Sequence, residues 1–115
     1  MIIRENTRDS VSTITLAGTL DALSAPELQS FSENSALSPN VVLDLSDVDF
    51  LDSSGLRVIR GMALKKRESG GDVILACMND DVRKVFNNTQ LVRLFHIYDD
   101  LDAAVTYAET NKKSI

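Results

Sequence analysis

Two apolar runs, each followed by a segment of helical character, constrain the fold of this chain more than any other feature. The run Val41-Val42-Leu43-Asp44-Leu45 is mostly apolar and β-branched at its start, which is typical of an interior strand. The segment after it carries apolar residues at helical spacing, namely Leu56, Ile59, Met62 and Ala63. A second buried strand is expected from Asp72 to Cys77, after a glycine stop at Gly70-Gly71. This alternation predicts an α/β layer with a largely parallel interior and right-handed crossovers.

The segments on either side extend the same pattern. Val11 to Ala17 alternates apolar and polar residues, as a half-buried strand does, and Ile2-Ile3-Arg4 is a candidate partner strand. A helix is expected from about Ala25 to about Ala36, with Ser24 and Glu27 as a capping box. The C-terminal part should contain a short helix capped by Asn79 or Asp80, a strand within Leu94–Tyr98 and a last helix capped by Asp99 or Asp100. We therefore predict a single α/β domain over residues 1–115, with a mixed β-sheet of about four to five strands and about four α-helices.

Composition limits the classes of partner. The chain has 115 residues, and its 12 Lys and Arg against 17 Asp and Glu give a net charge of −5, opposite in sign to that of a general nucleic-acid binder. No run approaches the roughly 18 apolar residues of a membrane helix, and the N-terminus is too short and too charged for a signal peptide. The single cysteine, Cys77, cannot form an internal disulfide. We expect a cytoplasmic protein with no nucleic-acid partner and no membrane partner.

Residues suited to catalysis or cofactor binding are sparse. His96 is the one histidine and should lie on a strand or loop surface, while Cys77 should be a small core residue. No glycine-rich phosphate loop is present. An enzyme or nucleotide-binding protein built on Asp21, Asp52 and Ser53 would lack a phosphate cradle and any base other than a carboxylate. We expect no cofactor, no metal and no enzymatic activity.

The stretch "FLDSSGLRVI" places an acid, two hydroxyls and a glycine at the junction between an expected strand and an expected helix. One interpretation is a helix cap worth roughly 1 kcal/mol, for which Asp52, Ser53 and Ser54 are all candidates. The other is a phosphorylation switch. A helix N-terminus favours an anion, and Gly55 would let another backbone approach closely. A phosphate on Ser53 would add about −1.5 to −2 charges beside Asp52 and close to Asp49, and would repel a docked partner.

The stretch "VVLDLSDVDFLDSSGLRVI" resembles the STAS-domain family of anti-sigma-factor antagonists, which are partner-switching phosphoproteins. The family signature is an apolar strand, a spacer ending in an aromatic and an apolar residue, and then Asp-Ser-Ser/Thr-Gly-Leu. "LAGTLDALSAPEL" is similar to its Gly-x-Leu-Asp element and first helix. The segment from Gly70 to Ala104 is similar to its glycine turn, fourth strand, short helix, and closing strand and helix. The resemblance covers nearly the whole chain.

The resemblance implies that Ser53 is the phosphoacceptor, that Ser54 fills the family's Ser/Thr position and that Asp21 lies on a loop near the acceptor. The partner-binding residues that it implies are Asp21, Asp52, Ser53, Ser54, Gly55, Leu56 and Arg57. Arg57 stands where many relatives have a small or apolar residue. It is either a solvated side chain of the helix or a cation that pairs with the phosphate or selects the partner.

In such systems a serine-protein kinase that is also an anti-sigma factor binds the unphosphorylated antagonist and releases its sigma factor. The kinase then phosphorylates the antagonist, the complex dissociates, and a PP2C-type phosphatase restores the binding form. The resemblance thus implies a monomer that is a substrate and ligand, with an output in transcription or another process. An alternative keeps the fold without the switch, as a STAS subunit of a lipid-transport ATPase or of a sensory scaffold.

Overall fold

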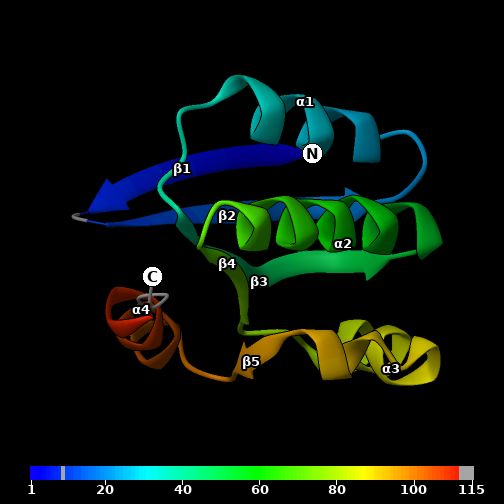
Figure 1. Cartoon of the computed structure of the whole chain (residues 1–115). Helices are drawn as coiled ribbons and strands as arrows, with labels where there is room; N and C mark the ends of the chain where they lie inside the picture. Colours follow the sequence, from blue (N-terminus) through cyan, green and yellow to red (C-terminus); the bar gives the residue numbers. More distant parts are fainter. Residues whose placement is uncertain (9, 112–115) are drawn as a thin grey trace.

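A five-stranded mixed β-sheet forms the centre of the computed structural model, which describes residues 1–8 and 10–111 (Figure 1). The elements follow one another as β1 (Ile2–Arg8), β2 (Val11–Leu20), α1 (Ala25–Asn34), β3 (Asn40–Leu51), α2 (Ser53–Glu68), β4 (Asp72–Ala76), α3 (Asp80–Thr89), the 3-10 turn η1 (Leu91–Leu94), β5 (His96–Tyr98) and α4 (Leu101–Thr110). Strands and helices alternate from β2 onward. The predicted α/β class and the predicted numbers of strands and helices are confirmed, while residue 9 and residues 112–115 of the predicted domain lie outside the described part.

The strands lie side by side in chain order, β1-β2-β3-β4-β5. β1 is antiparallel to β2, and the other pairs are parallel. Ile14, Leu43, Leu75 and Ile97 stand in one row across the four parallel strands. The parallel interior follows from the crossovers. Each of α1, α2 and the α3–η1 segment returns the chain to the end of the sheet at which the preceding strand began, so the next strand runs in the same direction.

Both faces of the sheet are covered, and side chains alternate between them along each strand. On one face Leu43 and its neighbours pack with residues of α1, α2 and α3 such as Leu28, Ile59 and Phe86, all fully buried. On the other face Val42, Ile74 and Ala76 pack against α4 through Ala104 and Ala108. The two small alanines let α4 lie close to the sheet. None of the helices in the described ranges is long and apolar enough to cross a membrane.

β3 is longer than predicted. The sequence predicts a strand from Val41 to Leu45, but the strand continues to Leu51. β2 pairs with it throughout, as far as Leu20 opposite Leu51, with irregular register between Thr15 and Ala17 and between Gly18 and Thr19. In the added part Val48 is buried while Asp47 and Asp49 are exposed. The carboxylates therefore lie on a half-exposed strand end rather than on a loop.

Two expected local features at other strand and helix ends are wrong. Ser24 precedes α1, but its hydroxyl makes no capping hydrogen bond; it donates to the Thr19 carbonyl over 2.6 Å, so the predicted capping box with Glu27 does not form. β4 ends at Ala76 because Cys77 has a left-handed backbone with φ of 63°, which a strand cannot accommodate. Cys77 is half-buried rather than a full core residue. By contrast, Gly70 adopts the expected left-handed conformation, with φ of 88°.

The remaining boundaries differ by less. α1 ends at Asn34, two residues before the predicted Ala36, and the last strand is confined to His96–Tyr98 because η1 occupies the preceding residues. Asn79 and Asp100 cap α3 and α4 by accepting hydrogen bonds from Val82 N and Ala103 N, so one member of each predicted pair of caps is confirmed.

Candidate functional site

The carboxyl ends of β2 and β3 meet the N-termini of α1 and α2 at one edge of the molecule, on the right in Figure 1. The backbone N–H of Asp52 donates to the Leu20 carbonyl over 3.2 Å, so the turn into α2 is joined directly to the end of β2. The start of α3 is joined to the same region, since Asn79 Nδ2 donates to the Val48 carbonyl over 2.9 Å. In open parallel sheets, functional groups gather at the carboxyl ends of the strands, as they do here.

Asp52 is the cap of α2. Its Oδ1 accepts hydrogen bonds from Ser54 N at 2.9 Å and from Gly55 N at 3.2 Å, and its carbonyl accepts from Leu56 N at 3.0 Å. Of the three candidate caps, the acid therefore takes the role and neither serine does. The sequence suggested that the N-terminus of the helix could hold a phosphate on Ser53. Because Asp52 already accepts hydrogen bonds from the amides of Ser54 and Gly55, these two amides would not hold it.

Ser53 is the first residue of α2 and is exposed to solvent, whereas Ser54 is half-buried. The Ser53 hydroxyl has no hydrogen-bond partner within residues 1–8 and 10–111. Capping by Asp52 thus leaves the hydroxyl that follows it available at the tip of the helix.

Gly55 and Leu56 position the serine rather than present surface of their own. Both are buried. A β-carbon on Gly55 would lie 2.7 Å from Leu20 Cγ, 2.7 Å from Leu51 Cδ1 and 2.9 Å from the Leu20 carbonyl oxygen. The close approach of another backbone, expected from the sequence, is therefore present: only a glycine lets the first turn of α2 rest on the ends of β2 and β3.

Asp21 shapes the loop between β2 and α1. Its Oδ1 accepts from Leu23 N at 3.0 Å, from Ser24 N at 3.1 Å and from the Ser24 hydroxyl at 3.3 Å. The hydrogen bond from the Ser24 backbone is the main cause that lowers the pKa of this carboxyl; burial, the next largest cause, acts in the opposite direction, and the hydrogen bond from the Leu23 backbone lowers the pKa further. The loop therefore carries a fixed negative charge at neutral pH.

Two large apolar side chains at this edge were not singled out from the sequence. Leu23 is 87% exposed and Phe50 is 52% exposed. Nearby, Asp49 Oδ1 accepts a hydrogen bond from the Thr19 hydroxyl at 3.0 Å. We call Asp21, Leu23, Asp49, Phe50 and Ser53 together the Ser53 surface. Strict alternation along β3 would place Phe50 on the same side as the buried Val48, so the sequence pattern did not indicate its exposure; the register irregularity between Gly18 and Thr19, where β3 pairs with β2, accounts for it instead.

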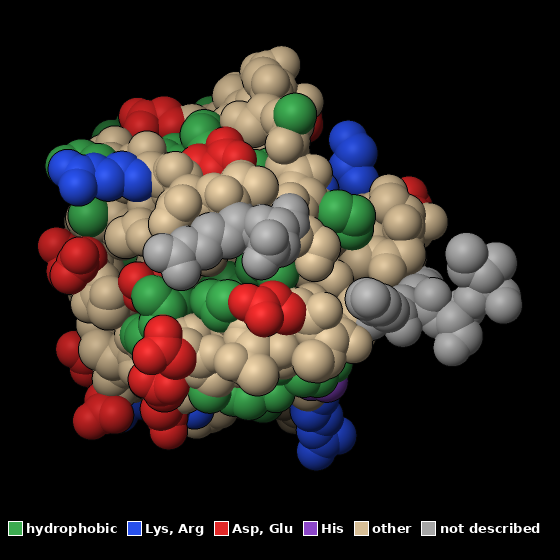
Figure 2. All heavy atoms as spheres, turned by 90° about the vertical axis from the view of Figure 1, so that its left-hand side faces the viewer, with side chains coloured by type: hydrophobic (Ala, Val, Ile, Leu, Met, Phe, Trp, Pro, Cys, Tyr) green, Lys and Arg blue, Asp and Glu red, His purple; other side chains and the backbone are tan. Residues whose placement is uncertain are grey.

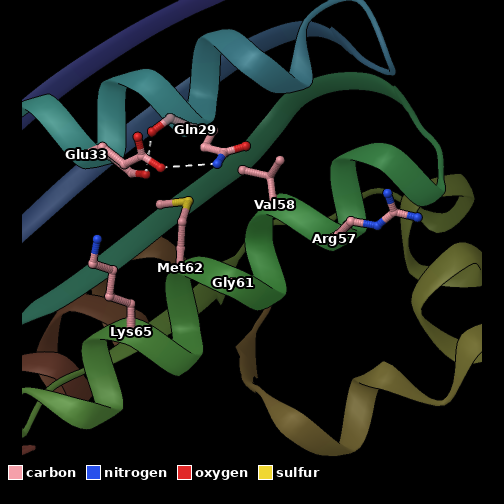
Figure 3. A pocket seen from close by; sticks show the side chains of 8 residues that line it. Gln29, Glu33, Arg57, Val58, Gly61, Met62 and Lys65 are labelled. Carbon is pink, nitrogen blue, oxygen red and sulfur yellow. Dashed lines mark hydrogen bonds between the residues drawn. The ribbon is translucent and has the colours of Figure 1, made fainter.

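Arg57 is exposed on α2, one helical turn after Ser53, and residues at this spacing are neighbours on a helix surface. It also lines a groove between α1 and α2, in which Val58 and Met62 supply apolar surface (Figure 3). Its side chain extends away from Met62 and Lys65, toward the first turn of α2. Both interpretations of Arg57 therefore stay compatible with its position.

Other reactive side chains lie elsewhere. His96 is exposed on β5, as predicted, where its ring lies 4.5 Å from that of Tyr107 and its Nε2 is 3.0 Å from the tyrosine hydroxyl. Burial raises the pKa of the Cys77 thiol, with Asp44 adding to the shift, so the reactive thiolate is disfavoured. In the part of the chain that is described, no group of three or more His, Cys, Asp or Glu side chains could hold a metal ion.

The family model for the STAS domain matches residues 3–104. The chain belongs to the STAS domain family. The anti-sigma-B factor antagonist of Listeria monocytogenes is 30% identical over 97 residues, covering 83% of this chain and 84% of that protein.

Two further proteins named as anti-sigma factor antagonists are similar to the chain. The anti-sigma F factor antagonist of Paenibacillus polymyxa is 33% identical over 70 residues, and the match spans 61% of this chain and only 60% of that relative. The crystal structure of an anti-sigma factor antagonist from Mycobacterium paratuberculosis superposes with a TM-score of 0.79 at 29% identity, covering 94% of this chain and 93% of that one. The STAS fold is therefore shared along almost the whole length.

Proposed function

We propose that this protein is an anti-sigma factor antagonist switched by phosphorylation of Ser53. In its unphosphorylated form it binds a serine-protein kinase that is also an anti-sigma factor, and that kinase releases its target. Phosphorylation of Ser53 ends the interaction, and a PP2C-type phosphatase restores it. The observation that carries the proposal is the exposed Ser53 hydroxyl, left without a partner in the described ranges because Asp52 caps α2. The names of the relatives support the role of antagonist.

Charge explains how the modification would act. A phosphate adds about −1.5 to −2 charges, and it would do so beside the carboxylates of Asp52, Asp49 and Asp21. Two of the helix amides that could neutralise it, those of Ser54 and Gly55, are taken by Asp52, so the added charge would face solvent and a docked partner. A partner surface that accepts the neutral hydroxyl would then face a concentrated negative charge. A loss of about 1.4 kcal/mol in binding already weakens affinity tenfold.

Apolar contact would supply much of the attraction in the unphosphorylated form. Burying a leucine or phenylalanine side chain completely contributes roughly 1.5–3 kcal/mol. Leu23 and Phe50, at 87% and 52% exposed, have most or half of that area still available. We further propose that the protein is a cytoplasmic monomer. In a monomer the Ser53 surface stays accessible to the kinase, which phosphorylates it with ATP.

Intact-mass spectrometry after incubation with ATP and the partner serine-protein kinase of the source organism tests the proposal. We expect one added phosphate on the wild type and on Ser54→Ala, and none on Ser53→Ala. Ser54→Ala is the matched control because it removes the neighbouring hydroxyl from the same turn. Phosphate retained in Ser53→Ala, or none in the wild type, would overturn the assignment of Ser53.

A further inference from the structure

A groove of about 290 Å³ runs along the surface between α1 and α2 (Figure 3). Gln29 and Glu33 of α1 line one side, and Arg57, Gly61, Met62 and Lys65 of α2 line the other. A smaller hollow of about 160 Å³ continues it past Met62 toward Lys66. We call the two together the α1–α2 groove.

Gly61 lies in the middle of α2, where glycine is the poorest helix former after proline. Packing explains Gly55 and Gly71, because a β-carbon on Gly71 would lie 1.8 Å from the Pro39 carbonyl oxygen. It does not explain Gly61, which is exposed and would have no atom within 4 Å of an added β-carbon. The missing side chain instead leaves the floor of the groove open over Met62.

The groove has a cationic rim on an otherwise acidic protein. The chain has a net charge of −5, and Figure 2 shows Asp and Glu side chains spread over the end of the molecule opposite to the Ser53 surface. α2 nevertheless carries five of the 12 basic residues and a single acid. Arg57 and Lys65 stand one turn before and one turn after Gly61, and neither makes an ion pair with another described residue. On the opposite side Glu33 accepts a hydrogen bond from Gln29 Nε2 at 3.1 Å.

The size of the groove decides between two kinds of occupant. Cavities that bury a small ligand measure roughly 300–1,000 Å³, whereas the two hollows of this groove, about 290 and 160 Å³, each lie at or below the lower end of that range and are open to solvent. Its volume suits one or two side chains of a protein partner better. It also continues into the Ser53 surface, because Arg57 belongs to the groove and lies one turn from Ser53.

We propose that the α1–α2 groove binds an acidic segment of the same kinase that docks at Ser53. An apolar side chain of that segment sits over Gly61 against Met62, and its carboxylates pair with Arg57 and Lys65. This inference rests on the proposed function. The groove would be a second contact region beside the Ser53 surface. It would select the partner through the charges of Arg57 and Lys65 and through the space that Gly61 leaves for a partner side chain.

The test compares kinase affinities measured by calorimetry for the wild type, Gly61→Leu, Lys65→Glu and two controls on another side of α2, Arg60→Leu and Arg60→Glu. Gly61→Leu fills the groove and should fold at least as stably as the wild type, which urea unfolding checks. We expect Gly61→Leu to weaken binding roughly 10- to 100-fold and Lys65→Glu roughly 10-fold, with the Arg60 variants within about twofold of the wild type.

The outcomes separate this inference from the proposed function. If the wild type binds the kinase and both groove variants bind equally well, the groove inference is wrong and the proposed function stands. Equal losses in groove and Arg60 variants would also overturn it, because they would indicate a general effect of α2. A wild type that does not bind the kinase would overturn both. A change in the Met62 methyl resonance on adding kinase, absent in Gly61→Leu, would support contact at the groove floor.

Discussion

The same substitution at two glycines of α2 should change stability in opposite directions. Gly61→Ala adds a methyl group in open space, and Gly55→Ala adds one against the ends of β2 and β3. Both positions lie on one helix and both changes have identical chemistry. Any difference between them therefore comes from the surroundings of the added carbon atom.

The magnitudes follow from the contacts. Alanine is favoured over glycine by about 0.8–1.0 kcal/mol in a helix interior, and with no atom within 4 Å at Gly61 that gain should appear in full. At Gly55 the added carbon would meet Leu20 and Leu51 side-chain atoms at 2.7 Å and the Leu20 carbonyl oxygen at 2.9 Å. Both leucines are buried in the core, and overpacking of this kind costs about 1–3 kcal/mol. We expect Gly55→Ala to lose up to about 2 kcal/mol net, so that the variants differ by about 1–3 kcal/mol.

Urea unfolding followed by circular dichroism measures the difference. With a slope of roughly 2 kcal/mol per molar urea, the two midpoints should lie about 0.5–1.5 M apart, on either side of the wild type. Midpoints that shift in the same direction would refute the claim that Gly55 seats α2 on the sheet while Gly61 faces an open groove. Equal slopes for the three proteins are the control that the unfolding transitions are comparable.

Three further predictions concern the Ser53 surface and its support. Asp52→Ala should lower the free energy of unfolding by about 1 kcal/mol through loss of the α2 cap, whereas Asp52→Asn, which keeps the acceptor oxygen, should stay within a few tenths of the wild type; thermal unfolding checks both. Because the folded-state pKa of Asp21 is lowered, its carboxylate stabilises the fold above the unfolded pKa and loses that effect as the pH falls through the folded value. Asp21→Asn should therefore destabilise near neutral pH, and urea titrations should show the difference shrinking below about pH 4. Leu23→Ala and Phe50→Ala should each weaken kinase binding about tenfold without changing the melting temperature, while Ile2→Ala, 56% exposed on β1, should do neither.

Most of the fold could be predicted because the spacing of apolar residues and the positions of turn residues such as glycine indicate the same helix and strand boundaries. The apolar positions of α2, including Ile59 and Met62, are buried as their spacing indicates, and Gly70 ends that region in the expected conformation. The end of β3 was missed because its exposed alternate positions are aspartates, which favour loops in isolation. Pairing with β2 overrides that preference. The capping box predicted at Ser24 does not form, because the Ser24 hydroxyl is engaged by the preceding turn: it accepts from Asp21 N at 3.0 Å and donates to the Thr19 carbonyl at 2.6 Å.

The sequence indicated which residues form the candidate site, but not the structural role of each one. Sequence alone offered Asp52, Ser53 and Ser54 as equivalent caps, and only the observed hydrogen bonds show that Asp52 takes the amides. Gly55 could be assigned a close approach from its residue type, but its neighbours are distant in sequence. Leu23 could not be assigned, because exposure of a single leucine depends on how its loop is held, here by Asp21.

The affinity of the kinase for the protein before and after stoichiometric phosphorylation tests the account most directly. Calorimetry with ADP in place of ATP would hold each form fixed during the titration. We predict that the phosphorylated protein binds at least about 100-fold more weakly, equivalent to about 2.7 kcal/mol, and that Ser53→Ala binds within a few-fold of the unmodified wild type. Equal affinity of the two forms would contradict the claim that charge added at the tip of α2 ends docking.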